Sequence, residues 1–389
     1  MSEWKEYRLG DIADCALGKM LDQKKNQGTP RPYLNNVSLR WGSFNIDYSQ
    51  TMLFEDSELE RYQIKKNDII MCEGGEPGRC AVWTNESPIC YQKALHRIRV
   101  KEGFDNWFLY YYLRHFVLSG RAQVFFTGTT IKHFPLQALK SIVIKAPAFQ
   151  VQQKIASILS SLDSKIENNR KISANLEAQA QALFKHWFID FAPFKDGKFV
   201  ESELGMIPEG WRVGSILDIA ELYDYQRKPL SSMEREDMKG DYPYYGATSI
   251  MDYIDKYIFD GTYVLMGEDG SVVKDNGCPY LQYVWGKFWP NNHAHVMQGK
   301  NGFSTEMLYC FLSITDVRSI VTGAVQMKIS QRSMSHLLTV IPPKSVCGDY
   351  NRIIRPLFDL IKSTKEENVR LSTLRDTLLP KLMSGAIKV

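Results

Sequence analysis

The chain of 389 residues is long enough for two or three domains that each bury a core of their own. Its composition, 44% hydrophobic and 24% charged, excludes a disordered chain. Its most apolar run, residues 107–118, includes Arg114 and His115 and is too short to cross a membrane. The formal net charge is +4, but residues 1–148 carry 20 basic and 16 acidic side chains whereas residues 208–343 carry 12 and 16. Net charge therefore does not by itself predict a nucleic-acid partner.

The start of the chain and its cysteines predict a cytoplasmic protein. The sequence is charged from Glu3 onward, which is not the pattern of a signal peptide. The seven cysteines are an odd number and contain no Cys-x-x-Cys pair. We therefore expect reduced cysteines that pack in the interior, and no zinc site.

A segment near the start of the chain is repeated in its second half. Residues 4–13 read Trp-Lys-Glu-Tyr-Arg-Leu-Gly-Asp-Ile-Ala, and residues 211–220 read Trp-Arg-Val-Gly-Ser-Ile-Leu-Asp-Ile-Ala. The pair Leu109-Tyr110 recurs as Leu308-Tyr309. These repeats predict two copies of one unit of roughly 190 residues, an organisation suited to binding a two-part target.

Residues 1–148 and 208–343 have the pattern of short strands separated by turns. Apolar runs such as residues 69–71 alternate with clusters that contain Gly and Pro, and Asp260-Gly261 indicates a hairpin. One helix is predicted around residues 106–119. The expected fold class is α+β, with two mixed α/β domains related by internal repeat.

Two further segments have a helical pattern. Residues 149–188 and 344–389 place apolar side chains at alternating spacings of four and three, and each stripe contains one Asn. This heptad pattern predicts that the two helices pair as a coiled coil whose register the Asn residues fix; the alternative is that each is a surface helix packed on its own domain. Residues 189–207 between the first helix and the second domain are predicted to be a partly extended linker. The predicted seam consists of Leu159, Leu162, Ile166, Asn169, Leu176, Leu183 and Trp187 in the first helix and Ile354, Leu357, Ile361, Asn368, Leu371, Leu378 and Leu382 in the second.

Motifs that carry catalysis are missing from the sequence. The only Pro-Pro pair, Pro342-Pro343, is followed by Lys and lacks the context of an amine methyltransferase motif. No Gly-rich loop ends in Gly-Lys-Ser/Thr, and no Gly-x-Ser-x-Gly is present. His293 and His295 have the spacing of a metal pair on one strand face, but no third ligand stands out. We therefore expect no metal, and histidines that are either polar groups on a binding surface or hydrogen-bonded locally. The chain alone is expected neither to methylate nor to cleave DNA.

Several segments carry a resemblance to a known family. The junction, residues 179–193 and 203–211, resembles the central region of the specificity subunits of type I restriction–modification systems. The end of the chain, residues 374–385, is similar to the C-terminal helix of that family. Residues 244–246 and 291–295 are similar to stretches of its target recognition domains. The resemblance extends over essentially the whole chain.

The resemblance implies two target recognition domains, residues 1–148 and 208–343, that each read one half of a bipartite site on double-stranded DNA. The helices, residues 149–188 and 344–389, would form an antiparallel coiled coil that sets the spacing and docks two methyltransferase subunits. Two endonuclease/translocase subunits are the other implied partners. S-adenosylmethionine would be bound by the methyltransferase, which modifies adenine, and ATP with Mg by the endonuclease. The alternatives are a stand-alone DNA-modifying enzyme and a coiled-coil scaffold that binds only proteins.

Candidate DNA contacts are amide, basic and aromatic side chains near polar loops, because such groups pair with base edges or grip phosphates. The alternative is that these are ordinary surface and packing residues. Lys132 and Lys328 match at an offset of 196, and we predict that both grip phosphate. The predicted contacts are Asn35, Asn36, Arg40, Arg79 and Lys132 in the first domain and Tyr245, Lys274, Asn292, His293 and Lys328 in the second.

The predicted coiled coil also implies a length test. A heptad inserted after Asn169 is expected to need a matching heptad after Asn368, so that Leu176 and Leu371 stay in register.

Overall fold

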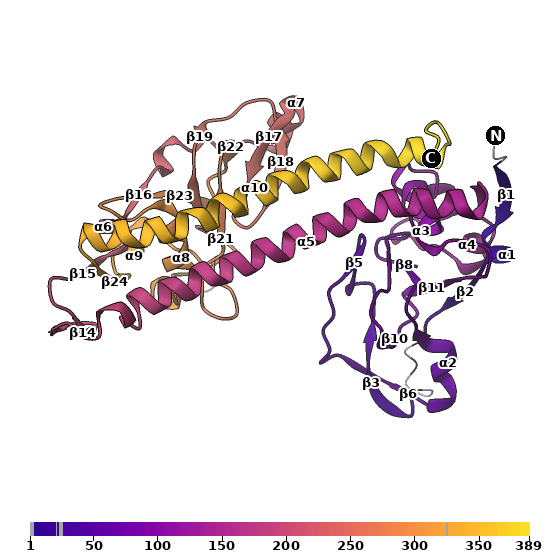
Figure 1. Ribbon diagram of the computed structural model, residues 1–389, viewed down its shortest axis with the longest axis horizontal. Helices are drawn as coiled ribbons and strands as arrows, with labels where there is room; N and C mark the ends of the chain where they lie inside the picture. The colour runs from indigo at the N-terminus through magenta and orange to yellow at the C-terminus, as the bar shows by residue number, and fades with distance from the viewer. Residues whose placement is uncertain (1–3, 21, 23–25, 324–325) are drawn as a thin grey trace. The chain divides into compact units, whose positions relative to one another are not determined.

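The computed structural model describes residues 4–20, 22, 26–323 and 326–389 and divides the chain into two compact units (Figure 1). Unit 1 comprises Met1–Asn168 together with Glu367–Val389, and unit 2 comprises Asn169–Glu366. Both long helices are therefore divided between the units, so that each unit contains half of each helix. In the described part of the chain, no helix is both long enough and apolar enough to cross a membrane.

Unit 1 contains two four-stranded sheets, with strand orders β2-β11-β8-β9 and β6-β3-β10-β7, and the antiparallel pairs β1-β12 and β4-β5. Strand β10 is parallel to β3 and antiparallel to β7. The strands are β1 (Lys5–Arg8), β2 (Ala13–Leu17), β3 (Thr29–Leu34), β4 (Leu39–Arg40), β5 (Ser43–Phe44), β6 (Thr51–Phe54), β7 (Gln63–Ile64), β8 (Ile69–Cys72), β9 (Cys80–Val82), β10 (Ile89–Tyr91), β11 (Leu95–Val100) and β12 (Val143–Ala146). The helices are α1 (Leu9–Ile12), α2 (Leu59–Tyr62), α3 (Asn106–Leu118), α4 (Leu136–Lys140) and the first half of α5 (Phe149–Phe188).

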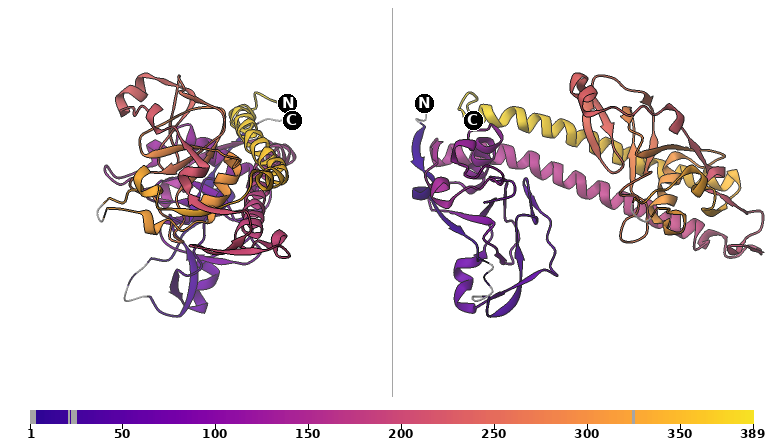
Figure 2. Two further views of the ribbon diagram at one scale, coloured as in Figure 1. Left: turned by 90° about the vertical axis from the view of Figure 1, so that its left-hand side faces the viewer. Right: turned by 180° about the vertical axis from the view of Figure 1, so that it is seen from behind.

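Unit 2 repeats this arrangement, with strand orders β16-β23-β20-β21 and β18-β17-β22-β19 and the antiparallel pair β15-β24 (Figure 2). Strand β22 is parallel to β17 and antiparallel to β19, as β10 is to its own neighbours in unit 1. The strands are β13 (Phe199–Ser202), β14 (Gly205–Pro208), β15 (Arg212–Ser215), β16 (Ala220–Leu222), β17 (Lys239–Tyr245), β18 (Ile250–Ile254), β19 (Phe259–Asp260), β20 (Tyr263–Gly267), β21 (Leu281–Val284), β22 (Lys287–Pro290), β23 (Ala294–Gly299) and β24 (Leu338–Ile341). The helices are α6 (Ile216–Ile219), α7 (Ser232–Asp237), α8 (Thr305–Ile314), α9 (Gln331–Met334) and α10 (Lys344–Met383). The predicted fold class, two mixed α/β domains related by internal repeat, is confirmed.

The single helix predicted inside the first domain, residues 106–119, is α3. It begins at a capping residue, because the Asp105 carboxylate accepts a hydrogen bond from the backbone N–H of Phe108 at 2.8 Å. Its counterpart α8 begins in the same way, with the hydroxyl oxygen of Ser304 accepting from the N–H of Met307 at 3.1 Å. In each unit this helix supplies large buried side chains to the main core, which explains the recurrence of its Leu-Tyr pair.

The paired helices are antiparallel within each unit. In unit 1 the Asn368 side-chain amide donates to the carbonyl oxygen of Ile166 at 3.2 Å. In unit 2 the hydroxyls of Ser173 and Thr364 lie 2.8 Å apart, and Tyr350 donates its hydroxyl hydrogen to the carbonyl oxygen of Ala180 at 3.1 Å. Residues later in α5 therefore contact residues earlier in α10, as an antiparallel pair requires. The predicted seam residues lie on the buried or half-buried stripe of both helices.

One expected pairing on this seam is wrong. Leu176 lies in the core of unit 2 with Ile361, whereas Leu371 belongs to unit 1. The two leucines hold similar places in the internal repeat, but in an antiparallel pair repeat-related positions are not neighbours. Register must therefore be taken from the interhelical hydrogen bonds and not from the repeat offset.

Residues 189–207, predicted to be a partly extended linker, contain the antiparallel hairpin β13-β14. Aromatic side chains tie this segment to the start of unit 2: the ring centroids of Phe191 and Phe194 lie 5.5 and 5.0 Å from that of Trp211. Trp211 in turn lies 5.9 Å from Phe188 at the end of α5. Aromatic packing of this kind stabilises a segment that pattern alone does not distinguish from a linker.

Candidate nucleic-acid interface

A buried histidine lies at the same place in each unit. His96 in β11 is 0% exposed and His295 in β23 is 1% exposed. The Nε2 atom of His96 lies 2.7 Å from the carbonyl oxygen of Phe134, and that of His295 lies 2.7 Å from the carbonyl oxygen of Ile329. A carbonyl oxygen can only accept a hydrogen bond, so both imidazoles donate from Nε2. Each histidine therefore fixes the residue at which a surface loop returns to the core.

Each of these loops is closed by a pair of residues that exchange both backbone hydrogen bonds, which we call a clasp. The clasp of unit 1 is Thr127 with His133, with N···O distances of 2.9 and 2.8 Å. The clasp of unit 2 is Thr322 with Lys328, with both distances 2.8 Å. Both clasps precede the last strand of their unit and lie at the surface.

Glycine follows the threonine of each clasp for a steric reason. Gly128 and Gly323 have φ angles of +91° and +87°, a region that L side chains rarely adopt. A Cβ atom at either position would lie 2.2 Å from a backbone oxygen, that of Ile131 or of Gln326. The repeated Thr-Gly pair is therefore a backbone requirement of the clasp.

A glutamate connects each clasp to the sheet. The carbonyl oxygen of Glu73 accepts from the N–H of Phe134 at 2.7 Å, and that of Glu268 accepts from the N–H of Ile329 at 2.8 Å. The carboxylate of Glu73 lies 3.0 Å from Nδ1 of His133, and the carboxylate of Glu268 lies 3.2 Å from Nζ of Lys328. Each clasp thus carries a basic side chain paired with the glutamate beneath it.

This geometry corrects the expected match between Lys132 and Lys328. The residue equivalent to Lys328 is His133, because each is the second residue of its clasp and pairs with the corresponding glutamate. The repeat offset here is 195 and not 196, so Lys132 corresponds to Met327. A one-residue error changes the assignment because neighbouring side chains in an extended segment point to opposite faces.

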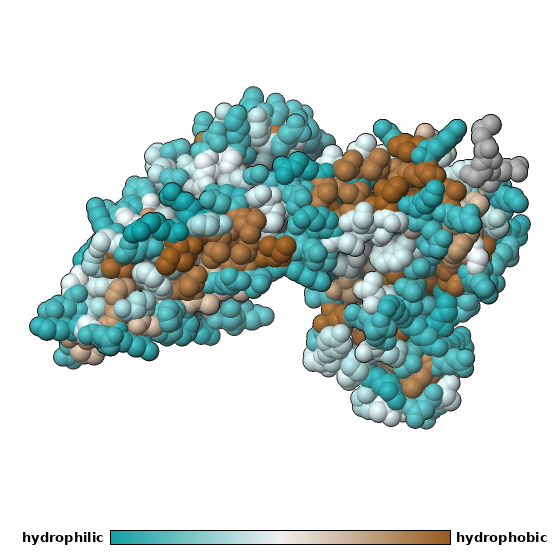
Figure 3. Space-filling view, in the orientation of Figure 1, coloured by the Kyte–Doolittle hydropathy of each residue, from teal (hydrophilic) through white to brown (hydrophobic). Residues whose placement is uncertain are grey.

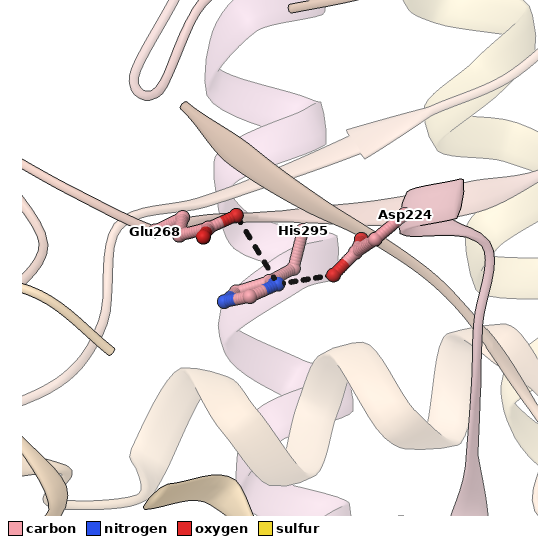
Figure 4. Close-up of side chains that lie close together, drawn as sticks. All are labelled: Asp224, Glu268 and His295. Atoms are coloured by element: carbon pink, nitrogen blue, oxygen red, sulfur yellow. Dashed lines mark hydrogen bonds and ion pairs between the residues drawn. The ribbon is translucent and has the colours of Figure 1, made fainter. Parts of the chain in front are cut away.

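Unit 2 adds a buried network of charged groups around its histidine (Figure 4). Nδ1 of His295 lies 2.6 Å from a carboxylate oxygen of Asp224 and 3.6 Å from one of Glu268. Arg227 donates to Glu268 at 2.7 Å and lies 3.6 Å from Asp224. The side chains of Asp224 and Arg227 are only 5% and 12% exposed. Burial raises the pKa of Asp224, but hydrogen bonds from His295, Gln331 and the N–H of Val296 outweigh burial and hold that pKa below its usual value.

Both ring nitrogens of His295 face hydrogen-bond acceptors. Nε2 lies 2.7 Å from the carbonyl oxygen of Ile329, and Nδ1 lies 2.6 Å from a carboxylate oxygen of Asp224. Asp224 is therefore the acid that pairs directly with this imidazole.

The same three side chains, Asp224, Glu268 and His295, have the composition of a metal site, but the distances between them do not suit a cation. Metal–nitrogen and metal–oxygen bonds to zinc are about 2.0–2.2 Å long, and at ordinary bond angles they hold the two ligand atoms roughly 3 Å or more apart. The distance of 2.6 Å between Nδ1 of His295 and the carboxylate oxygen of Asp224 fits a shared hydrogen instead. Arg227 and Lys328 already neutralise Glu268. The geometry favours an ion-pair network over a metal centre.

Among the described residues of unit 1, no carboxylate stands at the matching place opposite the histidine. His96 is paired across the sheet with Leu17 of β2, four residues after Ala13. Four residues after the matching Ala220 stands Asp224. The two units therefore share the histidine, the glutamate and the clasp, and differ in whether the histidine faces an acid.

The DNA contacts predicted in unit 1 divide into those at the surface and those occupied within the fold. Lys132 and Arg40 are exposed, although Arg40 donates to the carbonyl oxygen of Val37 at 2.6 Å. The side-chain oxygen of Asn35 accepts from the N–H groups of Val37 and Ser38 at 2.9 and 3.0 Å, which makes it a turn former.

Arg79 and Asn36 are joined to each other. The Arg79 guanidinium, 15% exposed, donates to the carbonyl oxygen of Asn36 at 2.7 Å and to the carboxylate of Glu76 at 2.5 Å. These contacts hold the 73–79 loop to the turn that contains Asn36. The Asn36 side chain is half-buried and close to Gly75, where a Cβ would lie 2.6 Å from its amide nitrogen.

In unit 2 the structure brings three of the five predicted contacts to the clasp. Lys328 belongs to the clasp, and Asn292 and His293 form the exposed loop beside it. The N–H of Glu268 donates to the carbonyl oxygen of His293 at 2.8 Å, and Nδ1 of His293 lies 2.5 Å from Asp269.

The other two predicted contacts of unit 2 lie elsewhere. Lys274 is exposed, with its Nζ 5.8 Å from the ring centroid of Tyr280. Tyr245 is half-buried in β17, with its ring centroid 5.8 Å from that of Phe288, and burial raises the pKa of its hydroxyl to about 12. Tyr245 is thus as much a packing residue as a surface one. Whether any of these ten residues contacts DNA stays a prediction.

Sequence reasoning did not identify six charged or histidine residues that build this region. A signal for the histidines existed, since His96 and His295 are 199 residues apart, the same offset as Leu109 and Leu308. The six missed residues are Glu73, His96, His133, Asp224, Arg227 and Glu268. Their roles depend on contacts between residues far apart in the chain.

Hydrophobic side chains also gather at the surface along the helix pair of each unit (Figure 3). Val369 and Leu374 of unit 1 are 68% and 47% exposed. On the helix pair of unit 2, the exposed apolar side chains include Ile172 of α5 and Ile353 and Leu360 of α10. Contiguous exposed apolar surface is typical of protein interaction sites.

Comparison with known proteins agrees with this architecture. The model of the type I restriction modification DNA specificity domain matches residues 1–178 and 208–373. A curated relative, the type I restriction enzyme MjaIX specificity subunit of Methanocaldococcus jannaschii, is 26% identical over 412 residues, which is 100% of this chain and 94% of the relative. A putative specificity subunit of Haemophilus influenzae is 34% identical over 140 residues, covering 36% of this chain and 35% of the relative. The crystal structure of the S subunit of a type I restriction-modification system from M. genitalium has a TM-score of 0.55 and 18% identity, and the match covers 98% of this chain and 96% of that one.

Two repeated domains that share one sheet topology, each with a half of an antiparallel helix pair, define a two-domain specificity protein. The chain belongs to the family of type I restriction–modification DNA specificity domains, of which it contains two copies. Its role is that of a type I specificity subunit. This result does not favour a stand-alone DNA-modifying enzyme or a scaffold that binds only proteins.

Proposed function

We propose that each unit reads one half of a bipartite double-stranded DNA site and that the surface around each clasp approaches the DNA. The observation that carries this proposal is the repeat of the clasp itself. Two units with the same sheet orders present the same glutamate-anchored clasp with a basic side chain, His133 in unit 1 and Lys328 in unit 2. Basic groups on surface loops suit contact with phosphates, and neighbouring amides such as Asn292 suit contact with base edges.

The helix pair is proposed to set the spacing between half-sites and to dock two methyltransferase subunits. The exposed apolar side chains on α5 and α10 support a protein partner there. We further propose that S-adenosylmethionine is bound by that methyltransferase partner and ATP with Mg by two endonuclease/translocase subunits. The chain itself would then carry no catalytic step. A genomic DNA target implies a cytoplasmic location.

Exchange of one recognition domain tests the proposal directly. Replacing residues 1–148 with the matching segment of a relative is expected to change one half of the modified site and to leave the other half intact. The exchanged segment carries both four-stranded sheets of unit 1, and β12 ends at Ala146, so each sheet moves whole. The measurement is genome-wide mapping of modified adenines in cells that carry the exchanged subunit and its partners. A simultaneous change in both half-sites would contradict independent reading.

Lys132 provides a test at the level of one side chain. Lys132→Ala is expected to weaken binding to specific and non-specific DNA alike and to reduce the slope of log K against log salt by about one unit, because one phosphate contact is lost. The measurement is DNA binding at several salt concentrations. Lys145→Ala is the matched control, because Lys145 is also exposed and lies on β12 paired with Glu6. An unchanged slope for Lys132→Ala would show that this lysine is merely solvated.

A further inference from the structure

We propose that His96 and His295 are positioning residues for the two clasps, and that acidification opens the clasp of unit 1 but not that of unit 2. The proposal concerns a difference between the two units that their shared topology conceals. Its consequence for DNA rests on the proposed function, but the state of the clasps is measurable without DNA.

The two imidazoles have a common role. Each donates from Nε2 to the residue that directly follows its clasp, Phe134 or Ile329, at 2.7 Å. That residue's N–H is bonded to Glu73 or Glu268. The end of each clasp is thus held on one side by the glutamate backbone and on the other by the histidine.

The surroundings of His96 come from β2, β8 and Phe134. Across the sheet it faces Leu17 of β2 and Met71 of β8, and the Phe134 ring lies edge-on to the imidazole with ring centroids 6.4 Å apart. In the part of the chain that the structure describes, its Nδ1 is buried without a hydrogen-bond partner. Glu73, the carboxylate whose charge acts on His96, is bonded to His133.

These surroundings favour a neutral imidazole. Burial lowers the pKa of His96 below its ordinary value of 6.5, against the smaller opposing effects of the Phe134 carbonyl and the Glu73 charge. A proton on Nδ1 would leave a buried charge without a bonded partner, which is costly.

His295 has different surroundings from His96. Its neighbours are Asp224 from the segment after β16, Glu268 after β20, Arg227, Lys328 of the clasp, and Met266 of β20. Both of its ring nitrogens face hydrogen-bond acceptors, and Nδ1 lies beside the Asp224 carboxylate. A positive charge on this imidazole would have a bonded acid as its partner, so acid is not expected to open the clasp of unit 2.

The sign of the pH effect follows from proton binding. When a buried histidine has a lowered pKa, the open state binds a proton more tightly than the closed state. The stabilisation of the closed clasp is complete above pH ~6.5 and decreases as the pH falls below that value. Opening of the unit 1 clasp is expected to increase by about tenfold per pH unit until the pKa of the closed state is reached.

The test is hydrogen–deuterium exchange of the full chain at pH 7.5 and 5.5, with rates corrected for the intrinsic pH dependence of exchange. The amides to follow are those of Thr127, His133 and Phe134 in unit 1, compared with Thr322, Lys328 and Ile329 in unit 2. Protection in unit 1 is expected to fall, by up to about tenfold, and protection in unit 2 is expected to stay unchanged. Equal loss in both clasps, or no loss in unit 1, overturns the proposal.

Three variants assign the effect to His96. His96→Gln keeps an N–H donor near the Phe134 carbonyl but does not titrate, so the acid-induced loss should disappear. Leu17→Asp supplies the carboxylate that unit 2 has at this place, and should also abolish the loss; Leu17 is partly exposed, so this variant remains informative if His96→Gln does not fold. His133→Lys, which gives unit 1 the clasp residue of unit 2, should retain the loss. Persistence of the loss in both His96→Gln and Leu17→Asp would overturn the proposal.

DNA binding separates this inference from the proposed function. Binding to duplexes with either half-site scrambled should show that acid weakens the half read by unit 1 more than the other half. Clasp opening without any such difference would leave His96 as the positioning residue and would contradict the role of the clasp in reading DNA.

Discussion

Replacement of Asp224 with alanine is expected to destabilise unit 2 by about 3–5 kcal/mol, because it removes one partner from a buried ion-pair network. The side chain is 5% exposed and accepts hydrogen bonds from His295 at 2.6 Å, Gln331 at 2.6 Å and the N–H of Val296 at 2.8 Å. Without it, Nδ1 of His295 keeps only the more distant carboxylate of Glu268, 3.6 Å away. The measurement is the free energy of unfolding from urea denaturation, followed by a probe in unit 2.

Asp316→Ala is the matched control for this substitution. Asp316 also pairs with an arginine, Arg318, but its side chain is 48% exposed, so its loss should change the free energy of unfolding much less than the loss of Asp224. The lowered pKa of Asp224 also determines the pH range over which this side chain stabilises unit 2. The contribution of Asp224 is complete above its ordinary pKa of 3.8 and is lost as the pH falls through the lower pKa of the folded state. Similar losses for the two alanine variants would show that the buried network does not stabilise unit 2.

A paired heptad insertion is expected to lengthen the preferred spacer by about three base pairs. One heptad adds roughly 10 Å to a helix, and the rise of DNA is about 3.4 Å per base pair. Both half-site sequences should stay as they were, because neither recognition domain is altered. Mapping of modified bases decides the outcome, and an unaltered spacer would show that the helices only dock partners.

The structure sharpens the placement of these insertions. Asn368 bonds to Ile166, and Thr364 bonds to Ser173, so the segment between Ile166 and Ser173 of α5 faces the segment between Thr364 and Asn368 of α10. A heptad after Asn169 therefore needs its partner between Thr364 and Asn368, for example after Glu366, and not after Asn368 as the repeat offset suggested. Insertion into α5 alone is the control, which should impair folding and partner docking because the two stripes no longer match.

The sequence by itself determined the features that depend on local spacing. The duplication was visible in matching segments at both ends of the units. The first long helix, predicted over residues 149–188, is α5 at Phe149–Phe188, because heptad spacing and the absence of Pro and Gly are local properties. The second was predicted over 344–389 and ends at Met383, six residues earlier than the chain. Gly385 beyond it has a φ of +72°, which is typical of the end of a helix.

Only the tertiary structure decided which polar side chains act together. Asn35 and Lys132 looked alike as surface candidates, yet Asn35 closes the turn that runs from Asn35 to Ser38, while Lys132 stays exposed. His293 was grouped with His295 by spacing, but His293 lies in the loop before β23 whereas His295 lies within the strand. His293 is therefore at the surface with Asp269, and His295 is buried with Asp224.

The physical reason is the distance along the chain over which these contacts form. His133 and Glu73 are 60 residues apart in sequence, and His295 and Asp224 are 71 apart. A periodic pattern records which face of an element is buried, since burial acts on every residue of that face. Ion pairs and hydrogen bonds act between single atoms, so their partners emerge only when the strands, the clasps and the loops between them are brought together.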